Sequence, residues 1–223
     1  MNGNVAYDSV REQNKYIAKV FSWMGIALLI SAISALYVGT NPTIFYRVNP
    51  FVILILEVGL VLILVGMLNK ISPVTATALF IVYSAINGIS LSGIFMMYSQ
   101  GTITSAFVTA AVMFGVFAVV GYTTRVDLSK YSSIFFMALI GLMIAGLINI
   151  FIGSSFLSLG VSAVGVVVFA GLTAYDIQTL KEHQRIFGQN HNMAIYGALQ
   201  LYLDFINIFL YLLRIFGFMN SDD

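Results

Sequence analysis

Long uninterrupted apolar runs are the feature of this sequence that most limits its fold. Seven segments of about 18–24 residues are almost entirely apolar, the length that spans a bilayer as a helix. Only 9% of the 223 residues are charged, against about 25% in a soluble domain, so a solvated surface cannot be covered. In lipid, only helices and closed barrels pair every backbone group. Barrel strands alternate in polarity, whereas these runs are continuous, so we expect an all-α integral membrane protein.

Breaks at charges, prolines and glycines divide the chain into seven expected transmembrane helices. Their predicted bounds are Val20–Val38, Pro50–Leu68, Val74–Tyr98, Ile103–Thr124, Ser132–Ile152, Phe156–Leu180 and Met193–Phe216. Because the connections are short, we expect a single seven-helix bundle over residues 20–216. A cytosolic N-terminal segment, residues 1–19, precedes it, and a short C-terminal tail, residues 217–223, follows it. The first segment has no signal-peptide pattern, so we expect the first helix to be retained.

The lysine and arginine bias predicts the orientation of the helices. With the N-terminus in the cytosol, the cytosolic segments hold eight basic residues: Arg11, Lys15, Lys19, Lys70, Arg125, Lys130, Lys181 and Arg185. The opposite side holds only Arg47 and Arg214. We therefore expect the C-terminus on the side opposite the N-terminus. The alternative is six spans with a re-entrant last run, but that run is long enough to cross.

Composition also excludes several classes of function. The chain has no cysteine, which removes disulfides, thiolate catalysis and cysteine-bound metals. The net charge is +1 and no basic stripe is present, so we expect no nucleic-acid partner. The two histidines, His183 and His191, fall in the expected cytosolic loop between the last two helices, where we interpret them as solvated loop residues rather than metal ligands.

Three acidic residues, Glu57, Asp176 and Asp204, lie inside apolar runs. A charged aspartate at the centre of a spanning helix costs about 2.5–3.5 kcal/mol, so such residues usually mark a functional site. Asp176 is expected about one turn from the cytosolic end of the sixth helix. Asp204 is expected roughly 16 Å deep in the seventh. On these bounds the two depths differ by about 10 Å, a gap that a late start of the seventh helix would close.

Asp204 lies on a helix face that carries a row of polar residues. Gln200, Asp204, Asn207 and Tyr211 share one side of the seventh helix. Because a polar stripe facing lipid would be costly, we expect the C-terminal helix to be central, enclosed by the other six. The alternative for Asp176 is that it lies at a helix end, at the level of the lipid headgroups, and has no further function. Glu57 has only apolar neighbours on its own helix, so its partner must come from another helix, whether it lines an ion pathway or is a structural acid.

A further stripe, Ser84, Asn87 and Ser90, lies on the third helix. It is more readily interpreted as polar glue between helices than as a site.

Two segments resemble a known family. Ala174-Tyr175-Asp176-Ile177-Gln178 and the later run Gln200-Leu201-Tyr202-Leu203-Asp204-Phe205-Ile206-Asn207-Ile208-Phe209 are similar to the motifs of the sixth and seventh helices of the Bax inhibitor-1 family. The second motif is the more specific one. The first departs from the family pattern at Ile177, where threonine is common, and the carboxylate is unaffected.

The resemblance implies a bacterial-type, seven-helix protein of the plasma (inner) membrane, with a central last helix. It implies a calcium leak modulated by pH and, in eukaryotic members, suppression of cell death. It also implies that Asp176 and Asp204 form a hydrogen-bonded pair that senses pH, with Glu57 on the ion pathway. A basic latch on the second helix is expected in the family; Lys70 is the nearest candidate here, and the helix itself has no arginine. Bacterial members are also tied to a membrane protease.

Simple chemistry agrees with such a sensor. Two carboxylates in a low-dielectric site cannot both ionise cheaply, so they share a proton and titrate as a unit. When both lose their protons, they repel each other and form a hard oxygen site suited to calcium, so Asp176 and Asp204 are also the hypothetical metal ligands. Gln200 and Asn207 are expected to line the pathway or support the pair. No cofactor is expected beyond calcium as the bound or transported ion, with the bilayer and protons as the other partners.

Three other functions were weighed against a pH-sensitive cation leak. An intramembrane aspartyl protease also needs two aspartates, but the second motif here reads Tyr202-Leu203-Asp204 rather than the glycine-rich form, and we expect no enzyme. A serine protease based on Ser90 or Ser92 lacks a histidine base inside a helix. A non-transporting regulator that binds a membrane protease or a cell-stress partner stays the main alternative, and calcium flux in proteoliposomes discriminates it.

Overall fold

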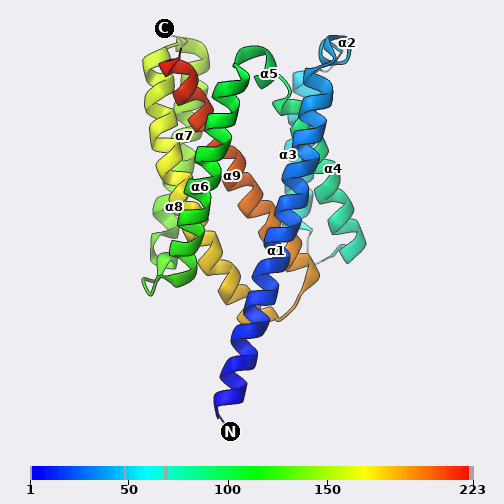
Figure 1. Cartoon of the computed structure of the whole chain (residues 1–223), viewed down its shortest axis with the longest axis vertical. Helices are drawn as coiled ribbons and strands as arrows, with labels where there is room; N and C mark the ends of the chain where they lie inside the picture. Colours follow the sequence, from blue (N-terminus) through cyan, green and yellow to red (C-terminus); the bar gives the residue numbers. More distant parts are fainter. Residues whose placement is uncertain (1, 48, 68–69, 221–223) are drawn as a thin grey trace. The chain divides into compact units, whose positions relative to one another are not determined.

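The structure is a computed structural model that describes residues 2–47, 49–67 and 70–220, without the side chains of residues 2–10 and 42. Every regular element in these ranges is helical (Figure 1). The elements are α1 (Asn2–Gly39), α2 (Pro42–Phe45), α3 (Pro50–Gly66), α4 (Pro73–Leu91), α5 (Ile94–Met97), α6 (Gln100–Thr123), the 3-10 helix η1 (Leu128–Tyr131), α7 (Ser132–Ile152), α8 (Ser155–Phe187) and α9 (His191–Met219). The prediction of an all-α membrane protein is confirmed.

Six helical segments are long and apolar enough to cross a membrane, and they include α1, α4, α6, α7, α8 and α9. The seventh expected span, α3, has 17 residues and rises about 26 Å, slightly less than the roughly 30 Å hydrocarbon core. Its predicted end at Leu68 lies outside the described residues, as does Ser221–Asp223 of the predicted tail. The chain is therefore a multi-pass helical protein, and a seventh crossing stays a prediction.

Helix starts follow local capping chemistry. The Asn49 side chain accepts hydrogen bonds from the backbone N–H groups of Phe51 and Val52, and Pro50 occupies the first turn of α3, as predicted. Ser72 caps α4 in the same way. Between α6 and α7, the Asp127 side chain accepts from the Ser129 hydroxyl and backbone N–H and so starts η1. These bonds lower the pKa of the exposed Asp127 carboxyl, and the bond from the Ser129 hydroxyl has the larger effect.

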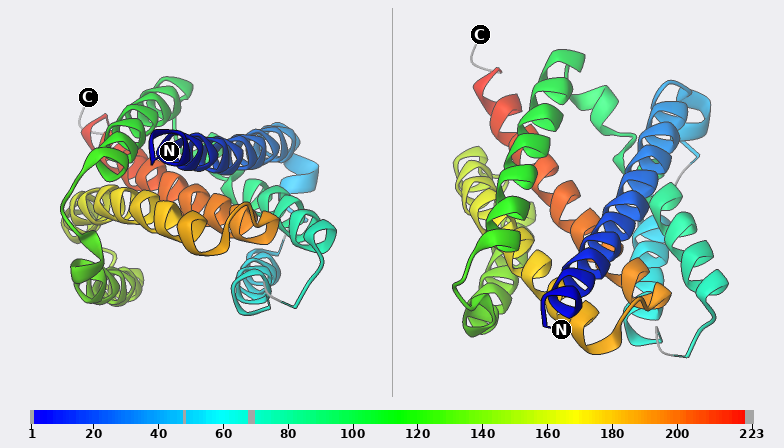
Figure 2. Two further views of the ribbon diagram at one scale, coloured as in Figure 1. Left: turned by 90° about the horizontal axis from the view of Figure 1, so that it is seen from below. Right: turned by 60° about the horizontal axis from the view of Figure 1, so that its bottom comes forward.

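The chain divides into two compact units. The first unit comprises the described residues within Met1–Met97 and Leu180–Tyr202. In it, α4 packs against α1 on one side and α3 on the other (Figure 2). The α1–α4 contact is close because Gly88 of α4 has no side chain, and a Cβ there would overlap the Ser31 backbone.

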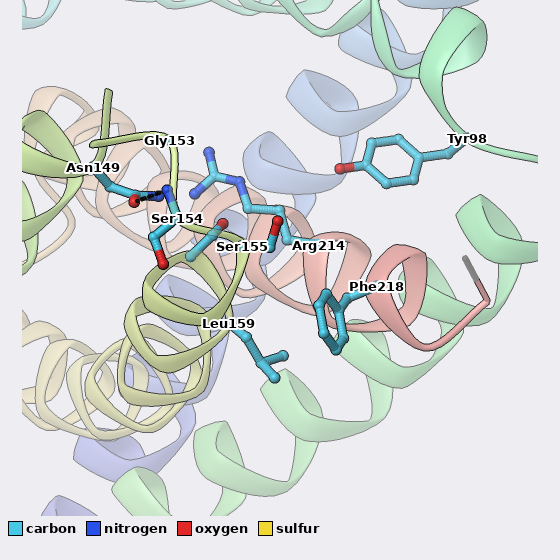
Figure 3. A pocket seen from close by; sticks show the side chains of 9 residues that line it. Tyr98, Asn149, Gly153, Ser154, Ser155, Leu159, Arg214 and Phe218 are labelled. Atoms are coloured by element: carbon cyan, nitrogen blue, oxygen red, sulfur yellow. Dashed lines mark hydrogen bonds between the residues drawn. The ribbon is translucent and has the colours of Figure 1, made fainter. Parts of the chain in front are cut away.

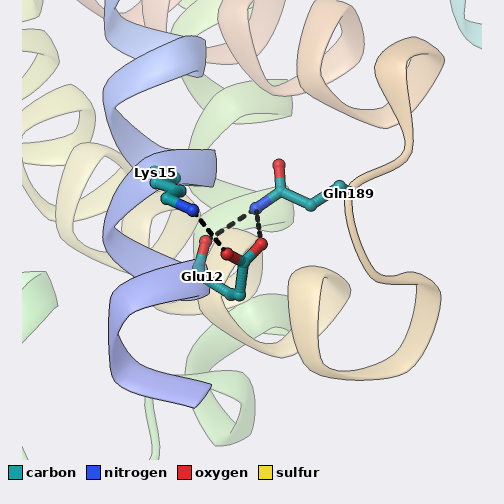
Figure 4. A network of polar contacts seen from close by, with 3 residues as sticks. All are labelled: Glu12, Lys15 and Gln189. Atoms are coloured by element: carbon teal, nitrogen blue, oxygen red, sulfur yellow. Dashed lines mark hydrogen bonds and ion pairs between the residues drawn. The ribbon is translucent and has the colours of Figure 1, made fainter. Parts of the chain in front are cut away.

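Polar contacts of the first unit tie the start of α1 to the turn after α8. Gln189 donates to the backbone oxygen of Glu12 (2.8 Å) and to its carboxylate (3.1 Å), while Lys15 pairs with the same carboxylate (2.7 Å) (Figure 4). The residues expected to form a cytosolic segment before the first span are helical from Asn2 onward, as the first part of α1. Exposed ion pairs of this kind contribute little to stability.

The second unit comprises the described residues within Tyr98–Thr179 and Leu203–Asp223. Aromatic rings join α6 to α9: Phe205 lies 5.4 Å from Phe107 and 5.7 Å from Phe114 between ring centroids, edge to face. Close backbone approach joins α6 to α8, because a Cβ on Gly121 would overlap Ala174. Small residues at such crossings are the usual means of helix packing in membranes.

Burial differs sharply among the spans. On α7 only Leu142 is buried, while apolar side chains such as Phe136 and Ile150 are exposed, as expected of a helix surrounded by lipid. By contrast, α9 is the most buried of the candidate spans, with half of its most apolar window inside the protein. That burial agrees with the expectation that the polar stripe of the last helix avoids lipid.

Candidate functional site

Asp176 of α8 and Asp204 of α9 are both buried within the second unit, with 6% and 4% of their surfaces exposed. The two carboxyl groups are close enough for their charges to act on each other. Among the described groups, those that act on the Asp204 carboxyl are Asp176 and Thr173, and no lysine or arginine is one of them. The structure therefore brings the two predicted acids together, and no basic group is among those that act on Asp204.

Helix lengths explain how the two acids reach similar depth. The sixth span was expected to end at Leu180, but α8 continues to Phe187, and α9 begins slightly early, at His191. Asp176 is thus 11 residues before the end of α8, and Asp204 is 13 residues after the start of α9. Ideal rise then leaves a depth difference of about 3 Å. The predicted gap was wrong, and the added turns of α8 close it rather than a late start of α9.

The α8–α9 connection is a tight turn. Three residues, 188–190, separate the helices, where a loop of about twelve was expected. Gly188 adopts a left-handed φ of +64°, and its N–H bonds to the Gln184 carbonyl oxygen at 2.9 Å, a typical helix C-terminus. Both histidines expected in that loop are helical instead. His191 opens α9, with Nε2 2.9 Å from the Thr77 hydroxyl and its ring 6.0 Å from Trp23.

Thr173 adds a constraint on hydrogen bonding of the pair. Its hydroxyl is buried and has one proton but two neighbouring acceptors, the Phe169 carbonyl oxygen at 2.8 Å and the Asp204 carboxyl. The hydroxyl can therefore donate to only one of these acceptors at a time, either the Phe169 oxygen or the Asp204 carboxylate. Oδ2 of Asp204 has no hydrogen-bond partner among the described residues.

Gln178 shows a structural role for the remainder of the first motif. Its side chain accepts from the Leu128 backbone N–H (2.7 Å) and donates to the Val126 carbonyl oxygen (2.8 Å). These two bonds hold the loop between α6 and η1 against α8. The motif thus combines a buried acid, Asp176, with a residue two positions later, Gln178, that fixes the neighbouring loop by hydrogen bonds.

A second polar group, which we call the Tyr202 network, lies in the first unit. Its members are Glu57 of α3, Asn87 of α4, Tyr202 of α9 and Ser31 of α1. Asn87 donates to the Glu57 carboxylate (3.0 Å) and accepts from the Tyr202 hydroxyl (2.7 Å). That hydroxyl lies 2.7 Å from Ser31 Oγ, which also lies 2.7 Å from the Ser84 carbonyl oxygen.

The network answers two of the sequence predictions. The partner of Glu57 does come from another helix, and Asn87 of the α4 stripe does join helices. The Ser84 hydroxyl instead donates to the Phe80 carbonyl oxygen of its own helix, and only the Ser84 backbone oxygen accepts from Ser31. Sequence reasoning missed Tyr202 and Ser31. Tyr202 lies inside the second motif but had no predicted role, and Ser31 is a lone hydroxyl in an apolar run.

The remaining predicted site residues are Gln200, Asn207 and Lys70. Gln200 belongs to the first unit, while Asn207 belongs to the second, where its amide donates to the Leu203 carbonyl oxygen of its own helix at 2.8 Å. Lys70 is exposed in the turn before α4, in the first unit, whereas the aspartates belong to the second. In the part of the chain that the structure describes, no three histidines or acids cluster as a metal site.

Comparison with known proteins finds a matching family model and similar proteins in other organisms. A family model described as inhibitor of apoptosis-promoting Bax1 matches residues 13–221. The inner membrane protein YbhL of Escherichia coli is 43% identical over 212 residues, which cover 91% of each chain. A protein of Borreliella burgdorferi is 47% identical over 94% of each chain, and a membrane protein of Streptococcus pyogenes serotype M6 is 39% identical over 97% of this chain and 99% of its own.

Proposed function

Because this chain belongs to the family of the inhibitor of apoptosis-promoting Bax1, the Bax inhibitor-1 family, we propose that it conducts a pH-sensitive leak of calcium or another cation across a membrane. One observation carries the proposal. Two carboxyl groups on neighbouring stretches of α8 and α9 are buried beside each other, and no basic side chain of the described residues acts on Asp204.

Electrostatics predicts whether the proposed gate opens at high or at low pH. Two buried carboxylates side by side are costly to ionise together, so the pair keeps a shared proton at low pH, and the resulting short hydrogen bond holds α8 to α9. As pH rises and the last proton leaves, the two like charges repel and the helices separate. Cation flux should therefore increase as pH rises.

Calcium is the substrate of this proposal rather than a resident ion. It prefers six to eight oxygen ligands, and two carboxylates supply at most four. A site of that kind attracts the ion without holding it firmly, which suits passage. Glu57 is proposed as a second acidic group on the pathway, with Asn87 positioning its carboxylate.

Topology forms part of the proposal. We propose that α3 also crosses the membrane, giving seven spans with the N-terminus in the cytosol and the C-terminus on the opposite side, in a bacterial inner membrane. The eight-to-two bias of basic residues supports it. A reporter fused after Asp223 should be active only on the non-cytosolic side, and cytosolic activity would contradict the seventh crossing.

Flux measurements test the gate. Purified protein in calcium-loaded liposomes is assayed from pH 6 to pH 8, with Asp176→Asn, Asp204→Asn and the double variant. Each single variant should lose most of the pH dependence, and the double variant should lose little more, because one coupled unit is broken. Asp127→Asn, which alters an exposed acid in a loop, is the matched control.

Two results would overturn the proposal. If both single variants keep the wild-type pH profile, the shared-proton gate is wrong. If the wild-type protein conducts no cation at any pH, a non-transporting regulator of a membrane protease or another partner becomes the better hypothesis.

A further inference from the structure

A cavity of about 320 Å³ lies in the second unit, where α7 turns into α8 beside the last turns of α9 (Figure 3). Its lining residues are Tyr98, Asn149, Gly153, Ser154, Ser155, Ser158, Leu159, Arg214 and Phe218. None of the functions argued above uses this cavity. Arg214 is the single charged residue in its wall, and no acid lines it.

The polar groups of the cavity are hydrogen-bond donors. The Asn149 side-chain oxygen accepts from the Ser154 backbone N–H at 3.1 Å, which fixes the amide and leaves its two N–H donors available. The Ser154 oxygen accepts from the Leu157 backbone N–H at 3.2 Å, so its own proton is also free to donate. Ser155 and Ser158 add further hydroxyls. Donors with a cation and no carboxylate favour an anion.

Arg214 lacks an acidic partner. Within the described ranges it forms no ion pair and donates to no carbonyl, and its guanidinium stands 5.6 Å from the centre of the Tyr211 ring. It is exposed and lies five residues before the end of α9, within a membrane-spanning helix. Charged residues in such helices are usually paired or reach the headgroup level. A planar guanidinium is the side chain best suited to bind phosphate through two parallel bonds.

An apolar cavity adjoins the polar one. It has a volume of about 430 Å³ and shares Asn149, Ser158 and Arg214 with the first. The other lining residues are mostly apolar: Leu142, Met143, Gly146, Leu147, Ile150, Val161 and Tyr211. Met143, Leu147 and Ile150 are exposed on α7, the helix whose surface faces lipid. A ligand that fills both cavities has an anionic head and an apolar tail.

We propose that these two adjoining cavities form a phospholipid site, in which Arg214 and the surrounding hydroxyl and amide donors bind the headgroup phosphate and an acyl chain lies along α7. The shared chemistry is that of a phosphate group, and the apolar second cavity assigns its source to a lipid rather than to a free anion.

Lipid binding by purified, delipidated protein tests the site. A phosphatidylglycerol with a fluorescent tail is titrated in detergent, and three unlabelled competitors follow: dioleoyl phosphatidylglycerol, dioleoylglycerol with the same tails but no phosphate, and inorganic phosphate. We expect the phospholipid to compete well, dioleoylglycerol at least about tenfold less well, and inorganic phosphate not at all at equal concentration.

Variants locate the binding. Arg214→Gln should weaken binding about tenfold, and Arg214→Lys should fall between it and wild type because it keeps the charge but loses the planar fork. Arg125→Gln, a change at an exposed basic residue between α6 and η1, should leave affinity unchanged. Gly146→Leu fills the apolar cavity at a position where a Cβ meets nothing within 4 Å, so it should weaken binding while the protein stays folded.

Three outcomes would overturn the proposal. Wild-type affinity in both Arg214→Gln and Gly146→Leu would show that the label binds elsewhere. Equal competition by dioleoylglycerol would show that no phosphate is recognised. Full displacement by inorganic phosphate at equal concentration would assign the site to a free anion.

Discussion

Replacing Gly88 by alanine should destabilise the first unit, although alanine is the better helix former. A Cβ at this position of α4 would overlap the Ser31 carbonyl oxygen and lie 2.8 Å from the Ser31 Cα. Carbon atoms in contact normally stand about 3.5–4.0 Å apart. The backbones of α1 and α4 must therefore separate by about 1 Å at this crossing.

That separation also affects the Tyr202 network. Ser31 Oγ donates to the Ser84 carbonyl oxygen at 2.7 Å, and an added 1 Å or so takes this distance beyond a hydrogen bond. Overpacking costs about 1–3 kcal/mol, and the lost bond costs about 1 kcal/mol more. The gain in helix propensity from glycine to alanine is about 1 kcal/mol. We expect a net loss of about 1–3 kcal/mol in the free energy of unfolding.

Gly25→Ala in α1 is the matched control. Nothing lies within 4 Å of a Cβ at Gly25, so the same substitution should be neutral or stabilising. Unfolding of each variant is followed in mixed micelles of a mild detergent and sodium dodecyl sulfate. The fluorescence of Trp23, the single tryptophan, reports on the first unit. If Gly88→Ala is as stable as wild type, the close approach of α1 and α4 is wrong.

Three further predictions concern hydrogen bonds and titration. Tyr202→Phe removes a fully buried hydroxyl that donates to Asn87 and should lower stability by about 1–2 kcal/mol, whereas the same change at the exposed Tyr37 should do nothing measurable in thermal unfolding. Glu57→Gln keeps an acceptor for its amide partner, so unfolding should be unchanged while calcium flux falls; unchanged flux would make Glu57 a structural acid. Asp127 has a lowered pKa in the folded state because of Ser129, so the stability it contributes is present above about pH 4 and is lost as pH falls further. The difference in unfolding temperature between wild type and Asp127→Ala should therefore shrink from pH 6 to pH 3, and a constant difference would exclude this linkage.

Apolar periodicity predicted the helices well where a break in the apolar run coincides with the end of a helix. The bounds of α7 agree with the prediction at both ends, Ser132 and Ile152. Prediction failed at the end of α8, because the run was ended at the first charged residue, Lys181. Lysine and glutamate are good helix formers, and the helix stops only at Gly188, whose left-handed φ supplies the stop.

The candidate site was predictable in kind but not in detail. A buried carboxyl needs a partner, so burial alone predicted that Glu57 would bond across helices. Naming Asn87 as that partner requires the rotation of α3 against α4, which no spacing within either helix contains. The same holds for Tyr202 and Ser31, which lie on helices that are far apart in the sequence.

The contrast between α7 and α9 has a consequence for how the chain is made. Of the candidate spans, α9 is the least apolar and the most buried, while α7 is the most apolar and the least buried. During synthesis α7 can therefore enter the bilayer on its own, whereas α9 is made after α1 to α8, which include the helices that cover Tyr202 and Asp204. A chain truncated before α9 would lack its most buried span and expose the faces that this helix covers. Quality control in the membrane would then have a clear feature by which to recognise an unfinished molecule.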